Sequence, residues 1–169
     1  GSVTVTGGTV VASWWNSTNT GAAVVVPVDN DSSLIGGTIQ LQGDAGGAGF
    51  VNVGASYTIL AGDLVAGTVL ISLTDAEIEA LTGFSEGDLL IFHAVITDIA
   101  DNPTIGGDST NTFTVDQTAP SVNAGTDKEV NAMVSQDATT SDGGSGLATH
   151  SWTQDSGSGT ITFGTASAV

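Results

Sequence analysis

A short connection between two stretches of β-type sequence, at residues 112–122, constrains this chain more than any other feature. Residues 112–115 alternate threonine with phenylalanine and valine, as a strand with one buried face does, and Asp116 follows. Pro120 fixes its own φ, lacks a backbone donor and holds Ala119 in an extended conformation. A new strand pattern begins directly afterwards. The segment predicts two β-domains, residues 1–117 and 118–169, connected by a stiff acidic joint (residues 116–120).

Strand signals recur throughout the first predicted domain. Alternating or β-branched runs occupy residues 2–6, 9–15, 22–28, 37–42, 57–60, 68–73, 89–97 and 111–115. Clusters of Gly, Asn, Asp and Ser separate these runs and are typical of turns. Short strands at this spacing predict an all-β sandwich.

One short helix interrupts the strand pattern. Thr74 and Glu77 have the spacing of a capping box, in which each side chain bonds the other residue's backbone N–H. Ile78, Leu81 and Phe84 can share one face, and Gly83 suits the end of the helix.

The second predicted domain is small. Strand signals occupy residues 130–134, 149–153 and 159–163, and Trp152 is the expected core aromatic. About 50 residues without disulfides are too few for a free-standing sandwich. We expect the first part of a sandwich that is completed by residues beyond Val169 or by another chain.

The charge balance of the chain is extreme. It has 18 Asp and Glu against one basic residue, Lys128, and a formal net charge of −17. Such a chain does not favour nucleic acids or anionic membranes, and divalent cations are the simplest means of offsetting the repulsion. The chain has no cysteine and no apolar run of about 20 residues, so neither disulfides nor membrane insertion is expected. This composition indicates an extracellular or cell-surface location.

Residues 92–102 resemble the Val-Thr-Asp-x-Ala-Gly-Asn segment of bacterial immunoglobulin-like tandem repeats, with Asp101 where that family usually has glycine. Residues 115–120 are similar to the Val-Asp-x-Thr-Ala-Pro linker of the same repeats. Downstream, residues 122–127, 141–146, 151–154 and 156–163 resemble part of a polycystic-kidney-disease-like domain. The resemblance implies an extender region of a large bacterial surface adhesin, with calcium at interdomain joints and no catalysis.

Acidic residues near the joint are the predicted calcium ligands, because calcium takes six to eight oxygen ligands. If the loop after residue 97 and the joint share one end of the sandwich, their side chains can contribute to one site. The predicted ligands are Asp98, Asp101, Asn102 and Asp116, with Asp127 or Asp142 from the next domain. Weaker candidates are Asp29 and Asp31 in one turn, and Asp137 beside Asp142. The alternative is a solvated loop in which Asp98 bonds its own backbone.

Three functions remain open at this point. The first is a structural repeat whose partners are neighbouring repeats of the same polypeptide. The second is self-assembly, in which an unpaired edge of the second domain takes a strand from another copy. The third is a glycan-binding accessory module that uses Trp14 or Trp15. His93 and His150 have no partner at catalytic or zinc spacing, so an enzyme is not expected.

Overall fold

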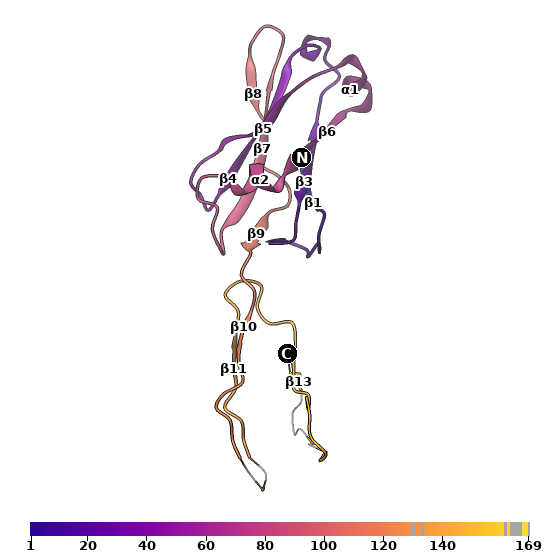
Figure 1. The fold of residues 1–169 in the computed structure, drawn as a ribbon. Helices are drawn as coiled ribbons and strands as arrows, with labels where there is room; N and C mark the ends of the chain where they lie inside the picture. The colour runs from indigo at the N-terminus through magenta and orange to yellow at the C-terminus, as the bar shows by residue number, and fades with distance from the viewer. Residues whose placement is uncertain (130, 133, 161, 163–166, 169) are drawn as a thin grey trace. The chain divides into compact units, whose positions relative to one another are not determined.

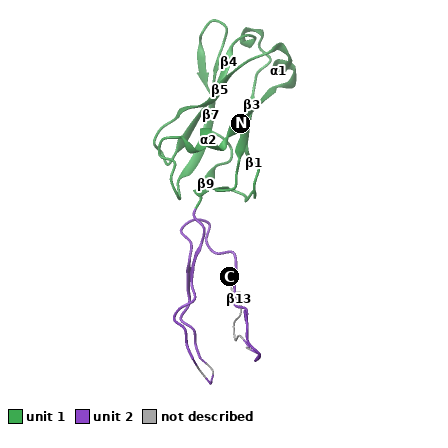
Figure 2. Ribbon diagram, viewed as in Figure 1, with its two compact units in different colours: residues 1–117 green, residues 118–169 purple. Residues whose placement is uncertain are grey.

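The computed structural model describes residues 1–129, 131–132, 134–160, 162 and 167–168. It divides the chain into two compact units, Gly1–Gln117 and Thr118–Val169 (Figure 2). Strands form most of the regular structure, and the helices are short. The prediction of an all-β protein is therefore confirmed.

Unit 1 contains two sheets (Figure 1). The first has the order β1 (Ser2–Thr6), β3 (Gly21–Pro27), β6 (Thr68–Thr74), and both of its pairings are antiparallel. The second has the order β2 (Trp14–Asn16), β9 (Phe113–Asp116), β7 (Leu89–Thr97), β4 (Thr38–Ala45), β5 (Val51–Thr58). A further short strand, β8 (Pro103–Ile105), pairs with the end of β7. Within the second sheet β2 and β9 run parallel, and the other pairings are antiparallel.

Alternation along the strands builds the core of unit 1. Every second residue of β1, β4 and β6 is buried, as expected when successive side chains face opposite sides of a sheet. The inward residues of both sheets belong to one apolar cluster, and Ile39, Leu90 and Phe92 are among its most enclosed side chains. Burying a side chain of this size contributes about 1.5–3 kcal/mol to folding, so this cluster is the main source of stability.

The two adjacent tryptophans have different surroundings. Trp15 is 1% exposed, and its indole Nε1 donates a hydrogen bond to Glu79 Oε1 at 3.3 Å. Trp14 is half-buried. The expectation that one ring fills the core is confirmed, and Trp15 has no free face on which a glycan could stack. The predicted strand at 9–15 is reduced to the three residues of β2.

The predicted helix is present as α2 (Asp75–Glu79), and its capping box is confirmed. The Glu77 backbone N–H donates to Thr74 Oγ1 at 3.3 Å, and the Thr74 backbone N–H donates to Glu77 Oε2 at 2.8 Å. Ala80 terminates the helix, so the prediction that Gly83 ends it is wrong. Gly83 instead takes a φ of 86° in the turn that follows.

A second helix, α1 (Ala61–Ala66), was not predicted. Its first turn is held by the Asp63 carboxylate, which accepts the Leu60 backbone N–H at 2.8 Å, and Gly67 ends it with a φ of 70°. Six residues including Gly62 give too short a pattern to detect. A 3-10 turn, η1 (Ser32–Leu34), follows β3. In the described part of the chain no helix has the length and apolar character needed to cross a membrane.

Unit 2 consists of two small ladders. β10 (Ser121–Asn123) pairs with β11 (Thr139–Ser141), and β12 (His150–Ser151) pairs with β13 (Ser167–Ala168). None of the unit 2 side chains whose burial the structure describes is fully buried, and Trp152 is only half-buried. The expected role of Trp152 as a core aromatic is therefore not realised, because two separate two-stranded ladders enclose little volume. The predicted strands at 130–134 and 159–163 fall partly on residues 130, 133, 161 and 163, which lie outside the described residues.

Gly54 in β5 offers a test of the core packing. Its φ is 67°, and a Cβ there would lie 2.5 Å from Cδ2 of the buried Leu73. Gly47 has a φ of 78° but nothing within 4 Å of such a Cβ. Both alanine substitutions should cost about 1 kcal/mol of unfolding free energy through the positive φ, and Gly54→Ala should cost about 1–3 kcal/mol more through overpacking. Chemical denaturation of the two variants measures the difference, and equal losses would contradict this packing.

Candidate functional site

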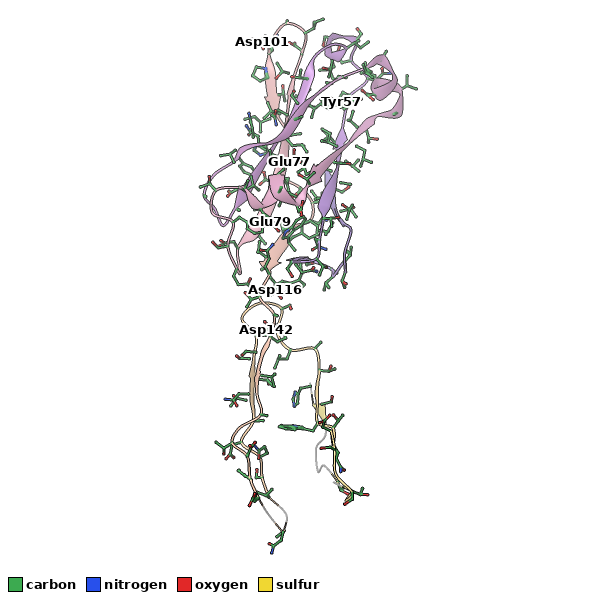
Figure 3. All side chains as sticks on the ribbon, in the orientation of Figure 1. Tyr57, Glu77, Glu79, Asp101, Asp116 and Asp142 are labelled. Carbon is green, nitrogen blue, oxygen red and sulfur yellow. The ribbon has the colours of Figure 1, made fainter. Side chains whose placement is uncertain are left out.

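The predicted ligands of unit 1 lie at opposite ends of the larger sheet. β9 runs antiparallel to β7 and pairs with its first residues, Leu89 and Leu90. Asp116 ends β9, whereas Asp98 follows the last residue of β7. At 3.3 Å per residue this register separates the two by roughly 35 Å, and Figure 3 shows Asp101 and Asp116 at opposite ends of unit 1. The expectation that the loop after β7 and the joint share one end of the sandwich is wrong. β7 and β9 are antiparallel neighbours, so their C-terminal ends lie at opposite ends of the sheet.

The Asp98 carboxylate closes the turn between β7 and β8. The backbone N–H groups of Ala100 and Asn102 each donate to Oδ1 at 2.9 Å, and Asn102 Nδ2 lies 3.0 Å from Oδ2. The Asn102 N–H is the main reason why the pKa of Asp98 lies below its ordinary value. This is the local turn considered as the alternative to a metal site, and it commits much of the acceptor capacity of Asp98.

Asp101 in the same turn has a φ of 66°. Only glycine adopts this left-handed conformation without cost, and Asp tolerates it better than most residues. The Asp101 side chain is exposed.

Asp29 and Asp31 lie beside this turn although they are far from it in sequence. The Ile99 backbone N–H donates to the Ser33 carbonyl at 3.2 Å, which joins the two loops. The Ser33 backbone N–H donates to Asp31 Oδ1 at 2.9 Å and is the main cause of the lowered pKa of Asp31, while the charge of Asp98 opposes that lowering. We call Asp29, Asp31 and Asp98 the acidic rim. Sequence analysis treated them as parts of separate sites.

The opposite end, where the chain leaves unit 1, has a different set of carboxylates. The Gln117 backbone N–H donates to Glu86 Oε2 at 2.9 Å, and Gln117 Nε2 donates to Glu79 Oε1. Asp116 precedes Gln117 and is half-buried. Glu79 and Glu86 were not predicted at the joint, because they lie 38 and 31 positions from Gln117 and no local pattern connects residues so far apart.

The predicted ligands of unit 2 differ in their surroundings. Asp137 Oδ2 lies 3.1 Å from Nζ of Lys128, the one basic residue of the chain apart from histidine, so Asp137 is an ion-pair partner. This pair is exposed and contributes little stability. Asp127 is exposed. Asp142 follows β11 and is half-buried, and its Oδ1 is enclosed without a hydrogen-bond donor from the residues that the structure describes. Such an oxygen commonly has a water molecule or a cation as its partner.

The predicted ligands would bind through carboxylate and amide oxygens, which suit calcium better than zinc, because zinc prefers nitrogen and sulfur ligands. Nevertheless, no group of three or more His, Cys, Asp or Glu side chains is arranged to hold a metal ion among the described residues. The metal-ligand assignments remain predictions.

His93 is held by several contacts of its own. Its ring stacks on Phe50 with centroids 3.8 Å apart, Nε2 lies 2.8 Å from Gln42 Oε1, and Nδ1 lies 3.4 Å from Asp108 Oδ1. Gln42 Nε2 in turn donates to Asn52 Oδ1 at 2.9 Å. The contacts join β7, β4 and β5 across one face of the sheet, which is a structural role.

No protein-family model, curated protein or solved structure matches this chain. Its function is therefore argued from the residues and their geometry.

The Asp98 turn predicts a specific pH dependence. Because the folded pKa of Asp98 is lowered, its ionised form stabilises the fold above about pH 4, and this contribution is lost as the pH falls through the folded pKa. The loss of stability caused by Asp98→Ala should therefore be larger at pH 7 than at about pH 2. Urea denaturation at both pH values measures it. Asp155→Ala removes an exposed carboxylate as the control, and a pH-independent difference for Asp98→Ala would contradict the turn.

Proposed function

We propose that this chain is a non-catalytic structural or adhesive repeat module of a large secreted or surface-anchored bacterial protein, stiffened by calcium at its interdomain joints. The observation that carries the proposal is the acidic end of unit 1. Glu79, Glu86 and Asp116 gather where the chain leaves that unit, and the sequence has almost no basic residues to neutralise them.

The strand order of unit 1 supports an immunoglobulin-like sandwich. In that fold one sheet contains the first, second, fourth and fifth strands, and the other contains the third, sixth and seventh. The order β1-β3-β6 against β9-β7-β4 corresponds to this arrangement except for the fourth strand, because β5 pairs beside β4 in the second sheet, where variable-type domains also carry additional strands, and β2 is a further addition to that sheet. The correspondence agrees with the resemblance of residues 92–102 and 115–120 to tandem repeats.

Calcium would stabilise the joint mainly by reducing the repulsion between its carboxylates. Two like charges at about 4 Å cost about 1 kcal/mol in bulk water and about 4 kcal/mol at an effective dielectric constant near 20. Asp116 and the acidic residues Asp127 and Asp142 of unit 2 are the proposed ligands, with backbone carbonyls and water. An ion that binds only the folded form also raises stability by mass action.

Calcium should raise the melting temperature of the full chain and increase its maximum dimension in small-angle scattering, and a chelator should reverse both changes. Asp116→Asn should reduce the response, because one charged ligand is lost. Asp155→Asn, which removes one negative charge at an exposed residue of unit 2, should respond as the wild type does. Unchanged melting and scattering in millimolar calcium would refute the stiffening.

Self-assembly is a second candidate, favoured by the open ladders of unit 2. Among the described residues the β10–β11 ladder pairs with no further strand, which leaves an edge open on each side, and Val122 in β10 is 77% exposed. Edges of this kind accept strands from other chains. A second copy would supply the missing pairings and cover the apolar side chains.

Light scattering after size-exclusion chromatography tests this candidate directly. Assembly through unit 2 should be weakened by Val122→Lys, since a lysine on an edge opposes strand addition. Val65→Lys makes the same change at a helix residue of unit 1 that is 88% exposed, and it should leave the assembly intact. A wild-type chain that stays monomeric at high concentration would exclude assembly.

A further inference from the structure

A cavity of about 540 Å³ opens into unit 1 between β3 and the β7–β8 pair. Leu34, Ala94 and Ile96 supply apolar surface in it, and the acidic rim of Asp29, Asp31 and Asp98 lines it as well. Its volume lies within the range of about 300–1,000 Å³ that is usual for small-molecule sites. The cavity lies at the end of unit 1 away from Asp116, so it is separate from the proposed joint.

The cavity exists because β1 and β8 each pair with only part of the neighbouring strand, β3 and β7 respectively, and leave the rest of it uncovered. β1 pairs with β3 only as far as Val25, so Val26 and Pro27 lie beyond the register of β1. On the other side, β8 covers only residues 95–97 of β7. The half-buried Ala94 and Ile96 contact the core cluster but are not fully covered.

The edges beside the cavity disfavour an added peptide strand. Pro27 on β3 and Pro103 on β8 both lack the backbone N–H that a pairing strand needs. Proline on an edge strand is one of the features that prevent strand addition. A compact ligand suits this opening better than an extended chain.

The rim gives the cavity a permanent negative charge. The Asp31 and Asp98 carboxylates are held in place by backbone N–H groups of their own loops, so they remain ionised at neutral pH. The chain has one Lys or Arg, Lys128 of unit 2, so no Lys or Arg side chain of unit 1 neutralises the rim, and Gly1, which carries the amino group of this chain, also lines the cavity. His93 also lines the cavity and already contacts Gln42 and Asp108.

Charge and apolar surface together define the ligand. A hydrated inorganic cation would use the rim but gain nothing from the apolar lining, and a neutral hydrocarbon would gain nothing from the rim. We propose that this cavity binds a small amphipathic cation, with its hydrocarbon part against Leu34, Ala94 and Ile96 and its ammonium group at the rim.

Three probes of equal chain length test the proposal by isothermal titration calorimetry on the full chain. Hexylammonium should bind saturably, and 1-hexanol and hexanesulfonate should bind at least about fivefold more weakly at low salt. Raising the salt to about 0.5 M should weaken hexylammonium binding, because the rim is exposed to solvent. Amide chemical shifts should change around Leu34, Ala94 and Ile96.

Two substitutions and their controls locate the site. Thr104→Trp adds a large side chain to an exposed residue of β8 that lines the cavity, and it should weaken hexylammonium binding by about tenfold or more. Asp29→Asn should weaken it about threefold by removing one rim charge. Val65→Trp and Asp155→Asn change exposed residues that do not line the cavity, and they should leave binding unchanged.

Circular dichroism establishes that each variant is folded, and Ala94→Leu provides a second way to fill the cavity if Thr104→Trp does not fold. The proposal is overturned if the folded wild type shows no saturable binding of hexylammonium. It is also overturned if hexanol or hexanesulfonate binds equally well, or if both cavity-filling variants bind as the wild type does. Failure of calcium to stiffen the joint would leave these results unaffected.

Discussion

Packing of alternate side chains between the two sheets of unit 1 is the interaction on which the structure depends. The chain has a single Lys or Arg, so attraction between charges contributes little to folding. Apolar burial around residues such as Trp15, Ile39 and Phe92 must exceed both the conformational entropy and the repulsion among carboxylates. The strand pairings position these side chains, and the connecting loops follow from those pairings.

Several carboxylates of unit 1 are used within their own turns. Asp31, Asp63, Glu77 and Asp98 each accept a hydrogen bond from a backbone N–H close by in sequence. These bonds satisfy donors that strand and helix ends leave without partners. In a chain with so few cations, this local bonding makes a high acidic content compatible with a folded domain, and it leaves the negative charge exposed at the surface.

The two ends of unit 1 present this charge in different settings. At the joint, Glu79 and Glu86 both contact Gln117, and the surrounding chemistry is polar. At the other end, the acidic rim borders a cavity that has apolar surface. We propose a divalent ion for the first setting and an amphipathic cation for the second, because burial and neighbouring side chains differ between the ends.

Sequence by itself determined the features that depend on residues a few positions apart. The all-β pattern, the capping box at Thr74 and Glu77, and the inward position of one tryptophan follow from local periodicity. It did not determine which loops meet. A hydrogen bond between two loops, from the Ile99 N–H to the Ser33 carbonyl, placed Asp31 near Asp98, and strand register separated Asp98 from Asp116. The incomplete cover over β3 and β7 produced the cavity. Such contacts join residues dozens of positions apart, and no short sequence pattern carries information on them.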